Sequence, residues 1–130
     1  MAAVSERLRA TGKETIVSLP PPYGWYHGYD YAALAPLEDA IQLMANNYVD
    51  QGPEPAAEVE EAIRGTLESI GEAHRQKVLL GILASSETPE TLTQKVGLAK
   101  RYSLGGITVW ALRWLTPEQM DALDRTVARR

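Results

Sequence analysis

The sequence contains no cysteine and only two histidines, His27 and His74. Without cysteine, the chain cannot form disulfides, use a thiolate nucleophile or hold zinc through sulfur. The histidines form no His-x-x-x-His pattern, so a zinc site is not expected. We therefore predict neither a metal site nor a cofactor.

Long apolar runs and excess positive charge are also missing. No stretch approaches the about 18 apolar residues of a membrane span, and the segment from Met1 to Gly12 lacks the apolar core of a signal peptide. The net charge of −4 argues against nucleic acid as a partner. The 130 residues suffice for one domain, whereas a complete (β/α)8 barrel needs roughly 250.

Helix-like and strand-like segments alternate along the chain. Strands are expected at 14–19, 40–45, 77–84 and 107–112, and helices at 4–11, 32–37, 56–73, 89–102 and 117–127. Thr88 and Thr116 are expected to cap the last two helices, the final one burying Met120, Leu123 and Val127. Three strands are nearly continuous apolar runs, as in a parallel sheet. Four such units form either a small open flavodoxin-like sheet or half of a barrel, and periodicity does not choose between them.

Several sequence segments favour the barrel. The segment Tyr102 to Trp110 (YSLGGITVW) resembles the last strand of family-18 glycoside hydrolases, where a Gly-Gly pair precedes a strand ending in tryptophan. Lys77 to Ile82 resembles the strand before it, and Tyr29 to Asn47 resembles strand six with its approach. Arg7 to Leu19 and Pro55 to Ile70 fit the neighbouring elements. The resemblance implies an α/β fold: residues 1–130 as one (β/α)4 domain, the carboxyl-terminal, parallel four-stranded half of a chitinase-like or spore cortex hydrolase-like TIM barrel.

The resemblance also implies that the catalytic acid is absent. In that family an Asp-x-x-Asp-x-Glu strand supplies it, and this strand would precede Met1. Asp121 and Asp124 have a matching spacing but fall on an amphipathic helix, where a solvated face is the better interpretation. Glu87 follows a strand, but its place beside Thr88 favours a helix-dipole role. We therefore expect no catalytic residue and no activity from the chain alone.

The same resemblance points to sugar-binding residues. Trp110 would floor the sugar site, unless it is a core tryptophan, and Asn46, Asn47 and Tyr48 follow the second strand. Five aromatic residues crowd into the segment 23–31, whose Trp25 and Tyr26 could stack on sugar rings or pack at a subunit interface. The ligand implied is an N-acetylglucosamine polymer, chitin or peptidoglycan.

Half a barrel leaves two sheet edges and one sheet face open. We therefore expect the chain to pair as a homodimer with two-fold symmetry, or to dock on a complementary amino-terminal half-barrel. Joined to that half, it would be part of an active glycosidase. The remaining alternative is a structural or interaction protein with the flavodoxin-like fold.

Overall fold

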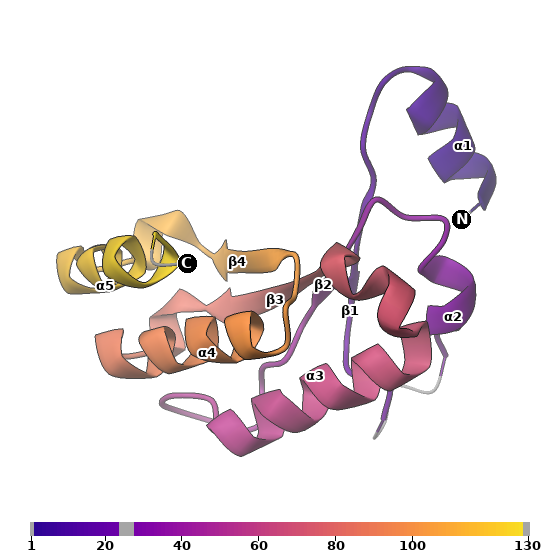
Figure 1. Cartoon of the computed structure of the whole chain (residues 1–130). Coiled ribbons are helices and arrows are strands. Elements are labelled where there is room, and N and C mark those ends of the chain that lie inside the picture. The colour runs from indigo at the N-terminus through magenta and orange to yellow at the C-terminus, as the bar shows by residue number, and fades with distance from the viewer. Residues whose placement is uncertain (1, 24–27, 129–130) are drawn as a thin grey trace.

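Four parallel strands form a single sheet in the computed structural model, which describes residues 2–23 and 28–128. The strands are β1 (Ile16–Leu19), β2 (Ala40–Leu43), β3 (Val78–Leu83) and β4 (Gly106–Trp110). They lie in the order in which they occur along the chain, each hydrogen-bonded in parallel to the next (Figure 1).

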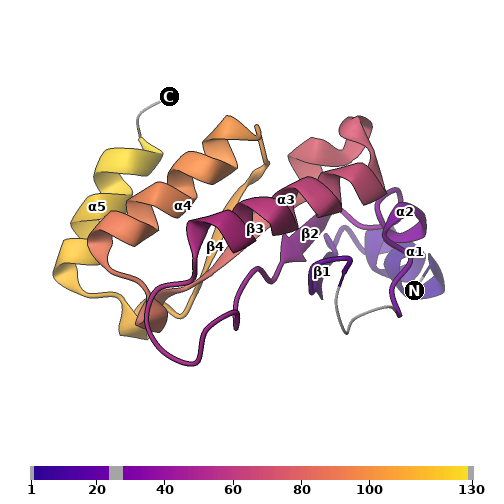
Figure 2. The same ribbon diagram turned by 90° about the horizontal axis from the view of Figure 1, so that it is seen from below.

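The helices follow one another along one side of this sheet, as Figure 2 shows. The α-helices are α1 (Ala2–Ala10), α2 (Tyr31–Leu34), α3 (Ala56–Ile70), α4 (Pro89–Arg101) and α5 (Pro117–Val127). Short 3-10 helices span Glu72–Lys77, Ala84–Ser86 and Leu112–Trp114. The helix expected at 56–73 ends at Ile70, because Gly71 has a φ of 80° and a 3-10 turn follows.

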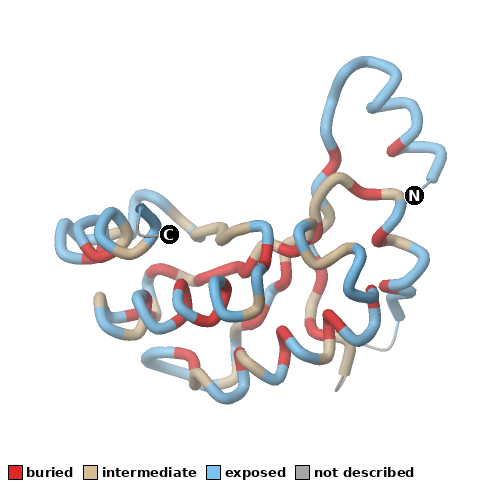
Figure 3. Tube along the Cα trace, in the orientation of Figure 1, coloured by how far each residue is buried: buried red, intermediate tan, exposed pale blue. Residues whose placement is uncertain are grey.

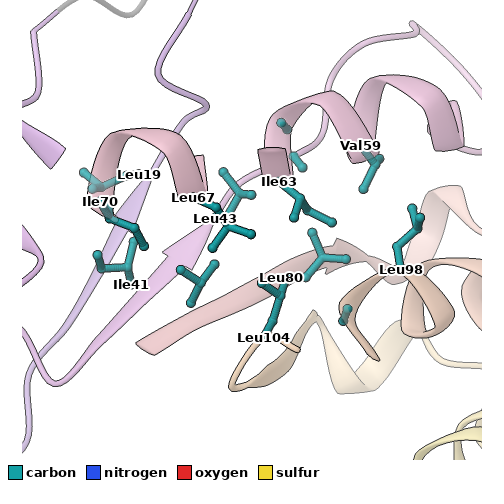
Figure 4. Packing of buried hydrophobic residues seen from close by; sticks show 14 of the residues in the cluster. Leu19, Ile41, Leu43, Val59, Ile63, Leu67, Ile70, Leu80, Leu98 and Leu104 are labelled. Atoms are coloured by element: carbon teal, nitrogen blue, oxygen red, sulfur yellow. The ribbon is translucent and has the colours of Figure 1, made fainter. Parts of the chain in front are cut away.

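The core lies between the sheet and these helices (Figure 4). Alternate strand residues, including Leu43 and Leu80, point at Ile63 and Leu67 of α3, and all four are at most 7% exposed. Full burial of each such side chain contributes roughly 1.5–3 kcal/mol. This one apolar layer fixes which face of every strand is turned inward.

The other sheet face carries no helix among the described residues. Its side chains include Ser18, Gln42 and Met44, together with Ile16 and Trp110, which are 59% and 64% exposed. Gly81 also lies here, and a Cβ at this position would come within 2.9 Å of the Leu43 carbonyl oxygen. Only glycine therefore fits at that point of the sheet.

The strand order decides between the two folds that periodicity left open. A doubly wound, flavodoxin-like sheet reverses its strand order and carries helices on both faces. Here the order is sequential and the helices lie on one side, as in a (β/α)8 barrel. The fold is a parallel four-stranded half-barrel, which confirms the prediction and corrects the flavodoxin-like alternative.

The last helix differs from the expected pattern. Gln119 and Ala122 of α5 are buried, whereas Met120 and Val127 are 42% and 52% exposed and Leu123 is half-buried. The Gln119 amide donates hydrogen bonds to the carbonyls of Ala84 and Glu87, which orients this polar residue inward. The capping boxes begun by Thr88 and Thr116 are confirmed.

The first helix is exposed along nearly its whole length (Figure 3). Val4 and Leu8 face solvent, while Ser5 is buried and donates to a Glu38 carboxylate oxygen at 2.8 Å. Across residues 2–23 and 28–128, no helix combines the length and apolar character needed to cross a bilayer.

Candidate functional site

A hollow of about 380 Å³ opens on the bare sheet face, toward the carboxyl ends of the strands. This is the end at which (β/α)8 barrels carry their active sites. Every strand or the segment just after it contributes to the lining, which consists of Ser18, Gln42, Met44, Asn46, Asn47, Gly81, Ile82, Leu83 and Trp110. The described lining is therefore uncharged and combines hydroxyl and amide groups with apolar groups.

Trp110 ends β4 and is the aromatic side of the hollow. It pairs in register with Leu83 of β3, and its side chain is 64% exposed. The peptide bond that joins it to Ala111 is cis. The structure thus places Trp110 outside the core, and an exposed indole beside polar groups is suited to stacking on a ring that has apolar faces.

Asn46 and Asn47 form the amide side of the hollow, directly after β2. The Asn47 side-chain nitrogen donates to the Asn46 side-chain oxygen at 3.1 Å. Asn47 adopts a φ of 66°, in the left-handed region that asparagine tolerates better than most residues. The structure therefore brings Asn46 and Asn47 into the same hollow as Trp110.

Tyr48 and Trp114 do not line the hollow. Tyr48 is half-buried against the core rather than in the hollow, and burial raises the pKa of its phenol, which stays neutral. Trp25 and Tyr26 lie outside the described residues. Trp114, 40% exposed, stacks under the Arg113 guanidinium at 4.8 Å and does not line the hollow.

A buried carboxylate, which the sequence analysis did not single out, holds the asparagine segment in place. Glu54 is 5% exposed, and its two carboxylate oxygens accept the backbone N–H groups of Asn47 at 2.7 Å and Tyr48 at 3.0 Å. Hydrogen bonds to an ionised acceptor are roughly twice as strong as neutral ones. Glu54 therefore fixes the backbone that presents both asparagine amides.

A buried ion pair extends this arrangement to the next loop and to α4. The Lys95 ammonium lies 2.7 Å from a Glu87 carboxylate oxygen and also donates to the Glu54 carbonyl at 2.7 Å. The other Glu87 oxygen accepts the Glu54 backbone N–H at 3.2 Å. Glu87, which directly precedes the cap of α4, is thus also a buried partner of Lys95, a contact that the sequence did not indicate. We call Glu54, Glu87, Lys95 and Gln119 the rim network.

No carboxyl group lines the hollow among the described residues. The carboxylates of Glu54 and Glu87 are engaged in the rim network, and Asp121 and Asp124 lie on exposed positions of α5. In the part of the chain that the structure describes, no group of acidic or histidine side chains could hold a metal ion. The hollow can form hydrogen bonds and stack on a ring, but its described lining offers no carboxylic acid to protonate a leaving group.

Comparison with solved structures identifies the architecture. A chitinase from Chromobacterium violaceum matches 99% of this chain and 60% of its own, with a TM-score of 0.86 and 19% identity. A class V chitinase from Pseudomonas fluorescens matches 97% of this chain and 60% of its own, with a TM-score of 0.83 and 18% identity. The Bacillus megaterium spore cortex-lytic enzyme SleL matches 96% of this chain and 44% of its own, with a TM-score of 0.81 and 14% identity. No family model matches the sequence, and no curated protein does.

These findings define the fold. The sheet order and one-sided helices make the chain half of a (β/α)8 barrel. More specifically, it has the fold of the carboxyl-terminal half of a chitinase-like barrel, a glycoside hydrolase-like fold. The chain spans 44% to 60% of the length of the structures just described.

Proposed function

We propose that residues 1–130 form one (β/α)4 unit that binds N-acetylglucosamine polymers, chitin or peptidoglycan, without hydrolysing them alone. The observation that carries this proposal is the hollow whose uncharged described lining includes Trp110, Asn46 and Asn47. Pyranose rings have apolar faces that suit an indole, and acetamido and hydroxyl groups suit asparagine amides. The chitinase-like fold supports the same ligand class.

The absence of activity rests on the chemistry of glycoside cleavage. Breaking a glycosidic bond requires a carboxylic acid to protonate the leaving oxygen. No carboxyl group is among the described lining residues, and the nearby buried acids are committed to the rim network. A second candidate function follows directly: the unit is part of an active glycosidase once another half-barrel supplies the acid.

A binding assay with chitin oligomers tests the proposal. Trp110→Ala should weaken binding about tenfold, the equivalent of ~1.4 kcal/mol, because it removes the stacking surface of the hollow. Trp114→Ala is the matched control, since Trp114 is exposed but lies outside the hollow. Equal affinities for Trp110→Ala and Trp114→Ala would contradict the assignment of the site.

Hydrolysis assays distinguish the two candidate functions. The chain alone should release no product from chitin oligomers, whatever its affinity for them. Cleavage by the purified chain, abolished by Trp110→Ala, would disprove the non-catalytic assignment. Cleavage only after a second half-barrel is added would favour the second candidate.

The half-barrel also requires a partner to close it. Either a second copy of the chain, forming a homodimer, or a complementary amino-terminal half-barrel would supply four more strands. The half-length match to the chitinase structures supports a need for such a unit.

A further inference from the structure

We infer that the partner which closes this half-barrel is a different unit: four parallel strands with three helices between them and none beyond its outer strands. A second copy of the chain does not satisfy this description. The inference rests on the proposed half-barrel function and specifies its partner.

The described α-helices of this chain outnumber the gaps between its strands. A closed (β/α)8 barrel has eight strands, eight gaps between neighbouring strands and one outer helix for each gap. In this chain α2, α3 and α4 serve the three gaps between its own four strands. The remaining helices, α1 and α5, come before β1 and after β4, so each belongs to a gap at the edge of the sheet.

Two copies of the chain would place two helices at each seam between them. The β4 edge of one copy would meet the β1 edge of the other, and that single gap would receive α5 from the first copy and α1 from the second. The outer ring of a (β/α)8 barrel holds one helix over each gap between strands. Packed helices need about 8–10 Å between their axes, so a second helix over the same gap would compete with the first for one place.

Both edge helices, α1 and α5, expose apolar side chains. Val4 and Leu8 of α1 are 55% and 38% exposed, and Met120 and Val127 of α5 are 42% and 52% exposed. At the β1 edge, Ile16 is 59% exposed. Apolar surface gathered in this way is typical of an interface.

A small apolar hollow marks the other edge. It has a volume of about 110 Å³, lies between α4, β4 and α5, and is lined by Leu104, Ile107 and Val127 among others. If no helix precedes the first strand of the partner, that strand would lie along β4 and under α5 and would cover this hollow. Likewise, its last strand would lie along β1 and under α1.

The length of the Chromobacterium violaceum chitinase is consistent with such a partner. About two fifths of the Chromobacterium violaceum chitinase has no counterpart here, since 60% of that chain is matched. A unit of four strands and three helices is smaller than this chain, whose described residues form four strands and five α-helices. The unequal split of the chitinase therefore has the size expected for the partner.

Co-purification tests the inference without any sugar. The chain is co-expressed with a tagged copy of the part of the Chromobacterium violaceum chitinase that it does not match, and separately with a tagged second copy of itself. We expect a one-to-one complex with the chitinase part. Ile16→Asp and Val127→Asp should each weaken that complex at least tenfold. Val49→Asp, a matched substitution at an exposed loop position away from both edges, should leave it unchanged.

Two outcomes would overturn the inference. One is a stable particle of two copies that Ile16→Asp and Val127→Asp disrupt and Val49→Asp does not. The other is no complex with either tagged protein, because the two edges would then not be seams. Circular dichroism of each variant confirms that the fold is retained. Failure to bind chitin oligomers would reject the proposed ligand and leave this result untouched.

Discussion

At the scale of single residues, the rim network is the feature that shapes the site. Glu54, Glu87 and Lys95 are each at most 7% exposed, and together they join the segments after β2 and β3 to α4. Breaking a buried ion pair by removing one partner leaves an uncompensated charge in a low-dielectric region. The rim therefore depends on these charges being present together.

Lys95→Met should lower the free energy of unfolding by about 3–5 kcal/mol, because the Glu87 carboxylate would stay buried without its cation. Arg101→Met on the same helix is the control, since its pair with Glu60 is 3.4 Å long and exposed. The Arg101→Met substitution should lower the free energy of unfolding by less than about 1 kcal/mol. Urea denaturation of both variants gives the comparison, and equal losses would show that the rim network does not stabilise the fold.

The sequence indicated some residues of the hollow but missed residues of the rim network. Trp110, Asn46 and Asn47 were predictable because a strand end and a family resemblance both marked them. Glu54 and Lys95 were not, because a carboxylate in a proline-containing loop and a lysine within the apolar stripe of a helix carry no local sign of a shared partner. Their roles depend on contacts across 41 residues, the separation of Lys95 from the Glu54 carbonyl that it contacts.

At the scale of elements, local sequence signals set the boundaries well. Thr88 begins α4 with a reciprocal capping box: its N–H donates to the Thr91 hydroxyl at 2.9 Å, and the Thr91 N–H donates to the Thr88 hydroxyl at 3.2 Å. The period of apolar residues and such caps are local properties, so helices and strands could be predicted. The exposure of Met120 and Val127 could not, because it depends on long-range hydrogen bonds from Gln119 to the Ala84 and Glu87 carbonyls, which turn the Gln119 face of α5 inward.

Thr88→Ala should destabilise the protein by ~1 kcal/mol, because the Thr91 N–H at the start of α4 loses its side-chain acceptor. Thr93→Ala, at an exposed position in the middle of the same helix, should be neutral or slightly stabilising, since alanine has the higher helix propensity. Thermal unfolding of the pair measures the difference. A Thr88→Ala variant as stable as Thr93→Ala would show that the cap contributes nothing.

At the scale of the whole molecule, the titrating groups define the pH range of stability. Hydrogen bonds from the Thr15 backbone N–H, and then from the Thr15 hydroxyl and Arg9, hold the pKa of Asp39 below its ordinary value of 3.8. A carboxyl whose folded pKa is lowered stabilises the fold above its unfolded pKa. That stabilisation is lost as the pH falls through the folded value.

Acid unfolding checks this expectation. Stability should decline once the pH drops below about 3.8, and Asp39→Asn should flatten the decline because the amide does not titrate. On the alkaline side, burial raises the pKa of Tyr31 from 10.0 to about 12, so its contribution is lost between those values and Tyr31→Phe should remove that loss. Unchanged pH profiles for both variants would contradict these assignments.

The position of Trp110 also makes the molecule its own optical probe. An indole that is 64% exposed emits at longer wavelengths than one shielded from water. Anything that covers the open face of the sheet, whether a sugar chain or the strands of a partner, should shift the emission of Trp110 toward the blue. Such covering could therefore be followed in real time on the unlabelled chain, with Trp110→Ala, which retains Trp25 and Trp114, as the reference for their emission.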